Sequence, residues 1–168
     1  SSAKRIETLP IYRVDDELEE YERYINGVLE FEFEKNNWIK TIERVNASGG
    51  SIKRVRVLPR KINSYIRFET ETGYVPNSVA GEKISVLSQK EYQSITPLEL
   101  WGDFWIFDNN IVLKLNYSKE GEFLYSEIVK SDELSKKIMD LYQELEKHSK
   151  PLNHLVKIIR NIDDINYY

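Results

Sequence analysis

The sequence contains no cysteine among its 168 residues, which excludes disulfide bonds, thiolate zinc sites and cysteine nucleophiles. It has only two histidines, His148 and His154, on either side of Pro151. They lack the i, i+4 spacing of a helical metal site, so we expect no metal site and no cofactor. The sequence also lacks a Gly-rich phosphate loop and a Gly-x-Ser-x-Gly motif. None of the common catalytic motifs is therefore present.

Long apolar runs are also missing. No segment reaches the roughly 18 consecutive apolar residues of a membrane span, and the N-terminus lacks an apolar signal core. An apolar share of 40% and a charged share of 31% are typical of a soluble globular protein, so we expect a cytoplasmic location and no membrane partner. We treat residues 1–168 as a single domain. Within it we give residues 1–4, a terminal remnant, no structural role, and expect residues 150–168 to form a C-terminal helical extension.

Charge is unevenly distributed along the chain, whose formal net charge is −4. Residues 15–34 are strongly acidic, whereas the segment 53–67 contains no acid. One interpretation of this segment is direct nucleic-acid binding, chiefly through Lys53, Arg54, Arg60 and Lys61. The other is pairing with the acidic N-terminal region inside the fold. The net negative charge argues against a surface built wholly for nucleic acid.

Helical periodicity appears in four segments, 15–26, 35–47, 131–147 and from Pro151 onwards. Asp15-Asp16 and Ser131-Asp132 supply N-terminal capping groups, and Gly27 and Gly49-Gly50 supply the stops. Proline suits the first turn of the last helix, because its missing N–H is not needed there. Residues 28–33 fit either a strand or the approach to the next helix.

Strand patterns fill most of the remaining chain. We predict strands over 52–58, 64–71, 82–87 and 123–129, and a hairpin over 102–115 with Asp108-Asn109-Asn110 as its turn. Apolar residues on both faces of the hairpin predict that it lies at the centre of the core. Residues 4–14 form an extended lead-in, and 88–101 a connection with one helical turn. The expected fold is α/β, with a mixed central sheet and flanking helices.

Charged residues near the ends of these strands form a candidate site. Glu69, Glu82, Asp103 and Asp108 lie there, with arginines on neighbouring strands, and aromatic residues such as Trp101, Trp105 and Tyr117 could line a pocket. One interpretation is a ligand-binding or acid–base cluster. The other is a salt-bridge network with turn residues. We assign no catalytic residue, and the candidate ligand-binding residues are Arg56, Arg67, Glu69, Glu82, Asp103, Trp105 and Asp108.

Several motifs along the chain carry a family resemblance. They are Glu7-Thr8 to Tyr12, the acidic helix ending at Gly27, the helix–Gly–Arg-Val-Arg-Val-Leu-Pro segment from Trp38 to Pro59, Tyr65 to Glu69, Ala80-Gly81-Glu82, Asp103-Phe-Trp-Ile-Phe-Asp108 and, more loosely, Leu141 to Leu145. In their order they resemble an uncharacterised bacterial family that is often encoded beside helix-turn-helix regulators. That family resembles one half of a phospholipase-D-type domain, which implies a phospholipase-D-like half-domain fold here.

The resemblance also implies that phosphodiesterase chemistry is lost. Active phospholipase-D-like enzymes use His-x-Lys-x-x-x-x-Asp, in which histidine attacks phosphorus and lysine neutralises the phosphate. With Asp108 at the Asp place, Trp101 and Asp103 occupy the His and Lys places, and neither can replace those groups. His148-Ser149-Lys150 provides a second His-x-Lys, but Leu155 then occupies the Asp place.

The leading hypothesis is a non-catalytic ligand-sensing or protein-interaction domain in transcription regulation or defence. Its candidate partners are a helix-turn-helix regulator, another protein or a second copy of the chain. The first alternative is an enzyme that acts on a phosphate ester through the carboxylate cluster. The second alternative is direct nucleic-acid binding through residues 53–67.

Overall fold

The computed structural model describes residues 1–28 and 37–166 and shows one mixed seven-stranded sheet with flanking helices. The sheet order is β6-β5-β4-β1-β2-β3-β7. Strands β1, β2 and β3 are parallel to one another, and the other neighbouring pairs are antiparallel. The predicted α/β class with a mixed sheet is confirmed. The strands are β1 (Ser2–Glu7), β2 (Ser51–Leu58), β3 (Lys83–Ser88), β4 (Asp103–Phe107), β5 (Ile111–Tyr117), β6 (Phe123–Ile128) and β7 (Lys150–Pro151).

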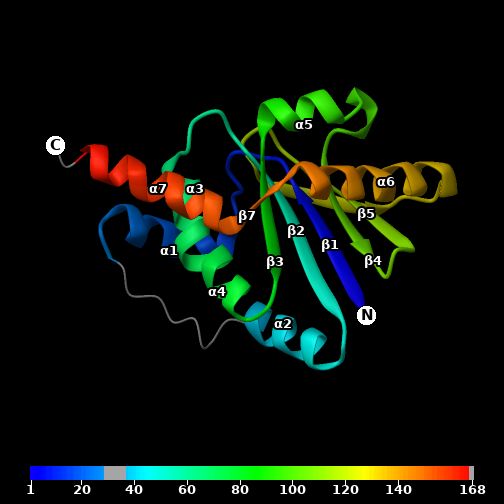
Figure 1. The fold of residues 1–168 in the computed structure, drawn as a ribbon, viewed down its shortest axis with the longest axis horizontal. Coiled ribbons are helices and arrows are strands. Elements are labelled where there is room, and N and C mark those ends of the chain that lie inside the picture. The colour runs from blue at the N-terminus through cyan, green and yellow to red at the C-terminus, as the bar shows by residue number, and fades with distance from the viewer. Residues whose placement is uncertain (29–36, 167–168) are drawn as a thin grey trace.

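Helices cover both faces of this sheet (Figure 1). One buried apolar cluster joins α5 and α6 to β1, β2, β4 and β5, and a second joins α3 and α7 to β3. The helical segments are α1 (Asp15–Ile25), α2 (Asn37–Ala47), α3 (Ser64–Phe68), the π-helical η2 (Glu69–Tyr74), α4 (Val75–Val79), α5 (Gln89–Ile95), the 3-10 turn η3 (Leu98–Leu100), α6 (Asp132–His148) and α7 (Leu152–Asn166).

The centre of the sheet is β1, which pairs with β2 on one side and β4 on the other. The expectation that residues 1–4 have no structural role is therefore wrong, because Ser2, Ala3 and Lys4 belong to this strand. The hairpin turn is confirmed, with positive φ angles of 50° at Asp108 and 53° at Asn109. Its predicted position in the core is confirmed for one face, since Phe104, Ile106 and Val112 belong to the main buried cluster. The predicted cover on both faces is wrong for β5, which lies second from the edge and is mostly only half-buried.

The strand predicted over 64–71 is a helix in the structure. The Asn63 side chain accepts a hydrogen bond from the Ile66 N–H at 2.8 Å and caps α3. The alternating apolar residues that suggested a strand are buried in two directions around the helix. Tyr65 and Phe68 pack in an aromatic cluster with Tyr12, and Ile66 packs in the α7 cluster. Packing on two sides of a short helix imitates the pattern of a covered strand.

Most other boundaries agree with expectation, including α1, α6, β2, β3 and the β4–β6 meander. Residues 88–101 contain α5 and η3 rather than a single turn, because Ser88 and Glu91 form a reciprocal capping box. The strand-or-helix alternative for 28–33 falls almost wholly outside the described residues, as do the first two residues of the helix predicted over 35–47. No helix in the described ranges is long and apolar enough to cross a membrane.

Side-chain alternation gives the central strands two very different faces. Ile6, Val55 and Val57 are buried in the cluster with α5 and α6. Their neighbours Arg54 and Arg56 point to the opposite face, where an apolar core would be the usual solution. That second face carries a buried polar network, and it positions the candidate site.

Candidate ligand-binding cleft

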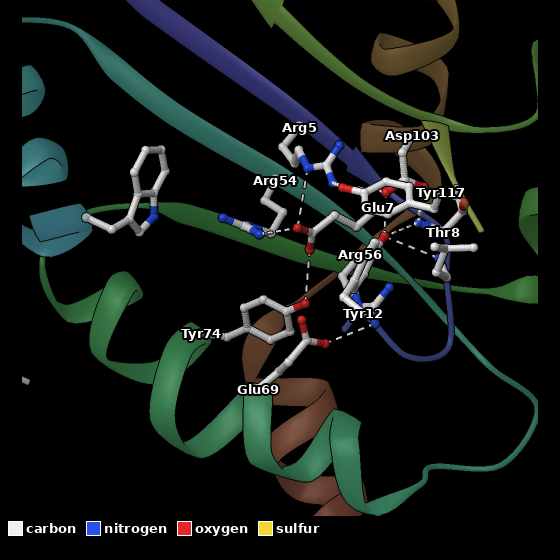
Figure 2. Close-up of polar contacts among 12 residues, drawn as sticks. Arg5, Glu7, Thr8, Tyr12, Arg54, Arg56, Glu69, Tyr74, Asp103 and Tyr117 are labelled. Carbon is white, nitrogen blue, oxygen red and sulfur yellow. Dashed lines mark hydrogen bonds and ion pairs between the residues drawn. The ribbon is translucent and has the colours of Figure 1, made fainter. Parts of the chain in front are cut away.

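The floor of the site is a buried ion-pair network built around Glu7, at the end of β1 (Figure 2). Glu7 Oε1 accepts hydrogen bonds from Arg54 Nη1 at 2.5 Å and from Arg5 Nε at 3.4 Å. Glu7 Oε2 accepts one from the Tyr74 hydroxyl at 3.0 Å. Arg54 also donates from Nε to Glu82 Oε1 at 2.7 Å. The network therefore ties together β1, β2, η2 and the residue that precedes β3.

Asp103, the first residue of β4, anchors the other end of the network. Its Oδ2 accepts hydrogen bonds from Arg5 Nη2 at 3.0 Å and from the Tyr12 hydroxyl at 2.5 Å. Its Oδ1 accepts from the Thr8 N–H at 3.0 Å and from the Thr8 hydroxyl at 2.6 Å. Arg5 Nη2 also donates to the Tyr117 hydroxyl at 3.2 Å. Four donor groups occupy Asp103, so this carboxylate fixes the chain after β1 against β4.

Arg56 lies beneath this layer and is fully buried. Its Nη2 donates to Glu69 Oε2 at 3.0 Å, and its guanidinium lies over the Tyr12 ring at 5.2 Å from the centroid. Figure 2 shows Glu69 and Tyr74 reaching this layer from the helical segment, opposite the strand residues. A buried charge is tolerated only when it is paired, so this ion pair fixes η2 against the sheet.

The network shifts the pKa values of Glu7 and Glu69 in opposite directions. Burial raises the pKa of Glu7, but the charges of Arg54, Arg5 and Arg56 outweigh burial and hold this pKa at about 2. Burial also raises the pKa of Glu69, and there the attraction of Arg56 is too weak to reverse the effect. Glu7 is thus firmly ionised, whereas Glu69 holds a proton more readily than an ordinary glutamate.

Above the network lies a cleft of about 350 Å³. This volume is at the lower end of the range for small-molecule sites. The sheet supplies one wall, with Arg5, Glu7 and Arg54, and α1, α3 and η2 supply the other. Aromatic rings line much of the cleft, and they are Tyr12, Trp38, Tyr65, Phe68, Tyr74, Trp105 and Tyr117.

Two residues of the cleft lining each have a buried side-chain atom without a hydrogen-bond partner among the described residues. The atoms are Arg5 Nη1, a donor, and Asn77 Oδ1, an acceptor. Both residues are more than nine-tenths buried. Such atoms in native proteins are rare and call for a specific explanation, of which an absent binding partner is one. Arg56 adds two unpartnered nitrogens, Nε and Nη1, in the layer below.

The helical wall of the cleft is acidic. Glu17 and Glu20 on α1 and Glu69 on η2 line it. Burial, followed by the charges of Glu69, Glu7 and Glu20, raises the pKa of Glu17 to about 7. No histidine lines the cleft, and within residues 1–28 and 37–166 no group of three or more His, Cys, Asp or Glu residues is arranged to hold a metal ion.

Comparison with models of protein families assigns the chain to a family. A family model described as a domain of unknown function (DUF6879) matches residues 1–157. The chain belongs to this family. The predicted resemblance to an uncharacterised family is therefore confirmed. No curated protein and no solved structure matches the chain, so the phospholipase-D-like half-domain fold stays a prediction.

In this DUF6879 domain, most of the predicted ligand-binding residues come together. Arg56, Glu69, Glu82 and Asp103 belong to the network, and Trp105 lines the cleft. Two others lie elsewhere. Asp108 lies in the β4–β5 turn, where its Oδ1 accepts a hydrogen bond from the Ser2 N–H, and Arg67 lies in the last turn of α3, outside the cleft lining. Trp101, the third aromatic suggested for a pocket, instead donates its indole N–H to the Thr96 carbonyl.

The basic segment 53–67 does not form one surface strip. Arg54 and Arg56 are buried in ion pairs inside the fold, and Lys53 pairs with Glu146 at 2.8 Å. Among the described residues, the carboxylate partners of the two arginines are Glu7, Glu69 and Glu82, none of which comes from the acidic segment 15–34. Arg60 and Lys61 are exposed, so direct nucleic-acid binding remains a prediction carried by fewer residues.

The residues at the centre of the DUF6879 site were not among the predicted site residues. Arg5 and Glu7 fell in the segment expected to be an extended lead-in, and Glu17 in the acidic helix predicted over 15–26. A signal for the first pair was available, because Arg5 and Glu7 alternate with the apolar Ile6 just as Arg54 and Arg56 alternate with valines. Matching alternation on two strands predicts a shared polar face.

Proposed function

We propose that this domain is a non-catalytic ligand-binding domain. Its cleft takes a small organic molecule, and the domain reports that molecule to a protein partner in transcription regulation or defence. The observation that carries the proposal is the aromatic-lined cleft, in which Arg5 Nη1 and Asn77 Oδ1 are buried without partners. Apolar walls with a few fixed polar groups are the usual composition of a small-molecule site.

The ion-pair network supports this function because it holds the cleft floor in place before a ligand binds. Glu7 joins three elements through Arg5, Arg54 and Tyr74. Preorganised polar groups lower the entropy lost on binding. A ligand that contacts η2 also contacts a segment that the Arg56–Glu69 ion pair and the Tyr74–Glu7 hydrogen bond hold to the sheet. This contact supplies a route from binding to a change at the surface.

The engagement of the carboxylates supports a non-catalytic role. Asp103 already accepts four hydrogen bonds, and Glu82 accepts from Arg54 and from the Trp38 indole. Both are structural acceptors rather than groups open to a reacting molecule. The phospholipase-D-like scaffold is part of the same proposal, since Trp101 and Asp103 stand where that chemistry needs histidine and lysine.

A second candidate function is acid–base catalysis through Glu17. A carboxyl group with a pKa of about 7 in a cleft is suited to proton transfer near neutral pH. The substrate of this alternative is less compatible with a phosphate ester, because Glu7, Glu17 and Glu69 would repel a phosphate in the cleft.

A thermal-shift screen of a metabolite library tests the proposal, with two matched variants at Gly73. This residue lines the cleft, and a Cβ added there meets no atom within 4 Å. Gly73→Phe should fill the cleft and abolish ligand-induced stabilisation, whereas Gly73→Ala should retain it. A library without hits, or hits that stabilise Gly73→Phe equally well, would overturn the proposal. Turnover of a hit by the wild type would favour the catalytic alternative.

The reporting step is a separate part of the proposal. Co-purification of the full chain with a helix-turn-helix regulator or another protein, with and without a hit from the screen, measures it. We expect one protein partner whose recovery changes when the ligand is added. Recovery of no stable partner under either condition would remove the reporting role and leave ligand binding alone.

A further inference from the structure

The chemical class of the ligand follows from the balance of charge around the cleft. The network holds three arginines, Arg5, Arg54 and Arg56, and these are paired with Glu7, Asp103, Glu82 and Glu69. Each arginine therefore already has at least one carboxylate partner. The positive charges of the three arginines are thus neutralised by carboxylates of the protein itself.

The acidic wall has no such compensation. Glu17 and Glu20 line the cleft, and neither has an ion-pair partner in the described part of the chain. The charged and titratable groups that act on Glu17 come from α1, β1, β2, α3 and η2. The groups that act most strongly are Glu7, Glu20, Arg54, Tyr65 and Glu69. Arg54 is the only cation among these, and two carboxylates already pair with it. Two further cations, Arg13 and Lys119, line a second cavity that Glu17 also borders, and Arg13 pairs with Glu122. A negative potential therefore remains on this wall.

The unpartnered atoms of the lining indicate what the ligand must offer. Asn77 Oδ1 is an acceptor that needs a donor, such as an N–H group. Arg5 Nη1 needs an acceptor, but its charge is already balanced by Glu7 and Asp103. A neutral hydroxyl or carbonyl oxygen would satisfy it. An anion would gain little at Arg5 and would meet uncompensated carboxylates at α1.

The aromatic rings favour the same class of ligand. Tyr65 and Phe68 line the cleft on the acidic side, between α1 and the sheet. Aromatic faces attract ammonium and guanidinium groups, and this attraction is stronger when water is partly excluded. Aromatic rings beside unpaired carboxylates form the usual surroundings of a bound organic cation.

We propose that the cleft binds a small organic cation, an amine or guanidinium compound that also carries a neutral hydrogen-bond acceptor. The cationic group lies at the wall formed by Glu17, Glu20 and the rings of Tyr65 and Phe68. The acceptor faces Arg5. The proposal rests on the proposed function, since it names the ligand class of that same cleft.

Three probes of similar shape and different charge test the class of ligand. Isothermal titration calorimetry of the full chain with benzylamine, benzyl alcohol and benzoate at pH 8 compares a cation, a neutral molecule and an anion. We expect benzylamine to bind at least tenfold more tightly than benzoate, because the carboxylates of Glu17 and Glu20 attract the ammonium group and repel the benzoate carboxylate. Lowering the pH from 8 to 5.5 should weaken benzylamine binding, because Glu17 becomes protonated while the amine stays charged.

Two glutamine variants of α1 locate the effect. Glu17→Gln should weaken benzylamine binding by about tenfold and remove most of its pH dependence, while it leaves benzyl alcohol binding unchanged. Glu19→Gln is the matched control, because Glu19 is exposed on the same helix and lies outside the cleft lining. Its affinity for benzylamine should equal that of the wild type.

The outcomes separate this inference from the function on which it rests. Benzoate or benzyl alcohol binding as tightly as benzylamine would overturn the cation class, yet it would leave a ligand-binding cleft. Equal weakening by Glu17→Gln and Glu19→Gln would also overturn it. If no probe binds but the library screen gives hits that Gly73→Phe abolishes, the cation class fails alone. Failure of both experiments overturns the proposed function as well.

Discussion

Replacing Glu17 with glutamine should stabilise the protein at pH 8 and leave its stability nearly unchanged at pH 4. Burial, then the charges of Glu69, Glu7 and Glu20, raise the pKa of Glu17 from 4.5 to about 7. A carboxyl with a raised pKa binds its proton more tightly in the folded state. Its contribution to stability is therefore fully present below pH 4.5 and is lost as the pH rises through 7.

The size of this loss follows from the difference between the two pKa values. A carboxyl with a pKa of 4.5 unfolded and 7 folded loses about 3 kcal/mol between pH 4 and pH 8. Glu17 keeps partial contact with water, which screens its neighbours, so we expect about 1–3 kcal/mol. Glutamine resembles the protonated acid in shape and carries no charge. The variant should therefore gain this amount at pH 8.

Urea denaturation at pH 4, 5, 6, 7 and 8 measures the effect, with Glu19→Gln as the control. The free energy of unfolding of Glu17→Gln should exceed that of the wild type by an amount that grows between pH 4.5 and pH 7 and levels off by pH 8. Glu19→Gln should stay within about 0.5 kcal/mol of the wild type throughout. A difference between Glu17→Gln and the wild type that does not vary with pH would refute the assignment of a raised pKa to Glu17.

Three further substitutions test the fold. Glu7→Gln should lower the free energy of unfolding at pH 7 by about 3–5 kcal/mol, because it leaves two buried arginines without their shared carboxylate. In the wild type, the stability that ionised Glu7 contributes is present above pH 4.5 and is lost as the pH falls through 2. Gly121→Ala should destabilise by about 1–3 kcal/mol, since φ is +90° and the added Cβ lies 2.4 Å from the Ile11 carbonyl oxygen. Asn63→Ala should cost about 0.5–2 kcal/mol through loss of the α3 cap. Urea denaturation measures all three, and losses below about 0.5 kcal/mol would contradict them.

Much of the fold could be predicted from local patterns. The long amphipathic stripe of α6, the Ser131 cap and the Asp108-Asn109 turn each depend on a few neighbouring residues, and all are present in the structure. The order of the strands could not be predicted in this way. It depends on contacts between distant segments, such as the pairing of β1 with β4, which joins residues about a hundred positions apart.

The errors share a physical cause. The helix over α3 and η2 was predicted as a strand because tertiary packing buries its residues on two sides, and this burial overrides the local pattern. The importance of β1 was missed because this short segment is rich in polar residues and lacks the apolar run of a typical central strand. Its Arg5 and Glu7 are charged, so they were not candidates for burial.

The sequence predicted several residues of the candidate site, but it did not predict how they are arranged in space. Glu69, Glu82 and Asp103 were singled out as strand-end carboxylates, and the structure brings them into one network with arginines. Both interpretations of these residues retain some support. The network is a set of structural ion pairs, and it also forms the floor of a cleft. What the sequence could not show is that α1 turns Glu17 toward that floor.

The most direct test of the cleft uses its tryptophans. Trp38 and Trp105 line the cleft, whereas the third tryptophan, Trp101, lies outside its lining and donates its indole N–H to Thr96. In a ¹⁵N-correlated NMR titration of the wild type with benzylamine, the indole N–H resonances of Trp38 and Trp105 should shift and saturate together, and that of Trp101 should remain in place. Equal shifts of all three resonances, or a shift of Trp101 alone, would contradict a ligand-binding site in this cleft.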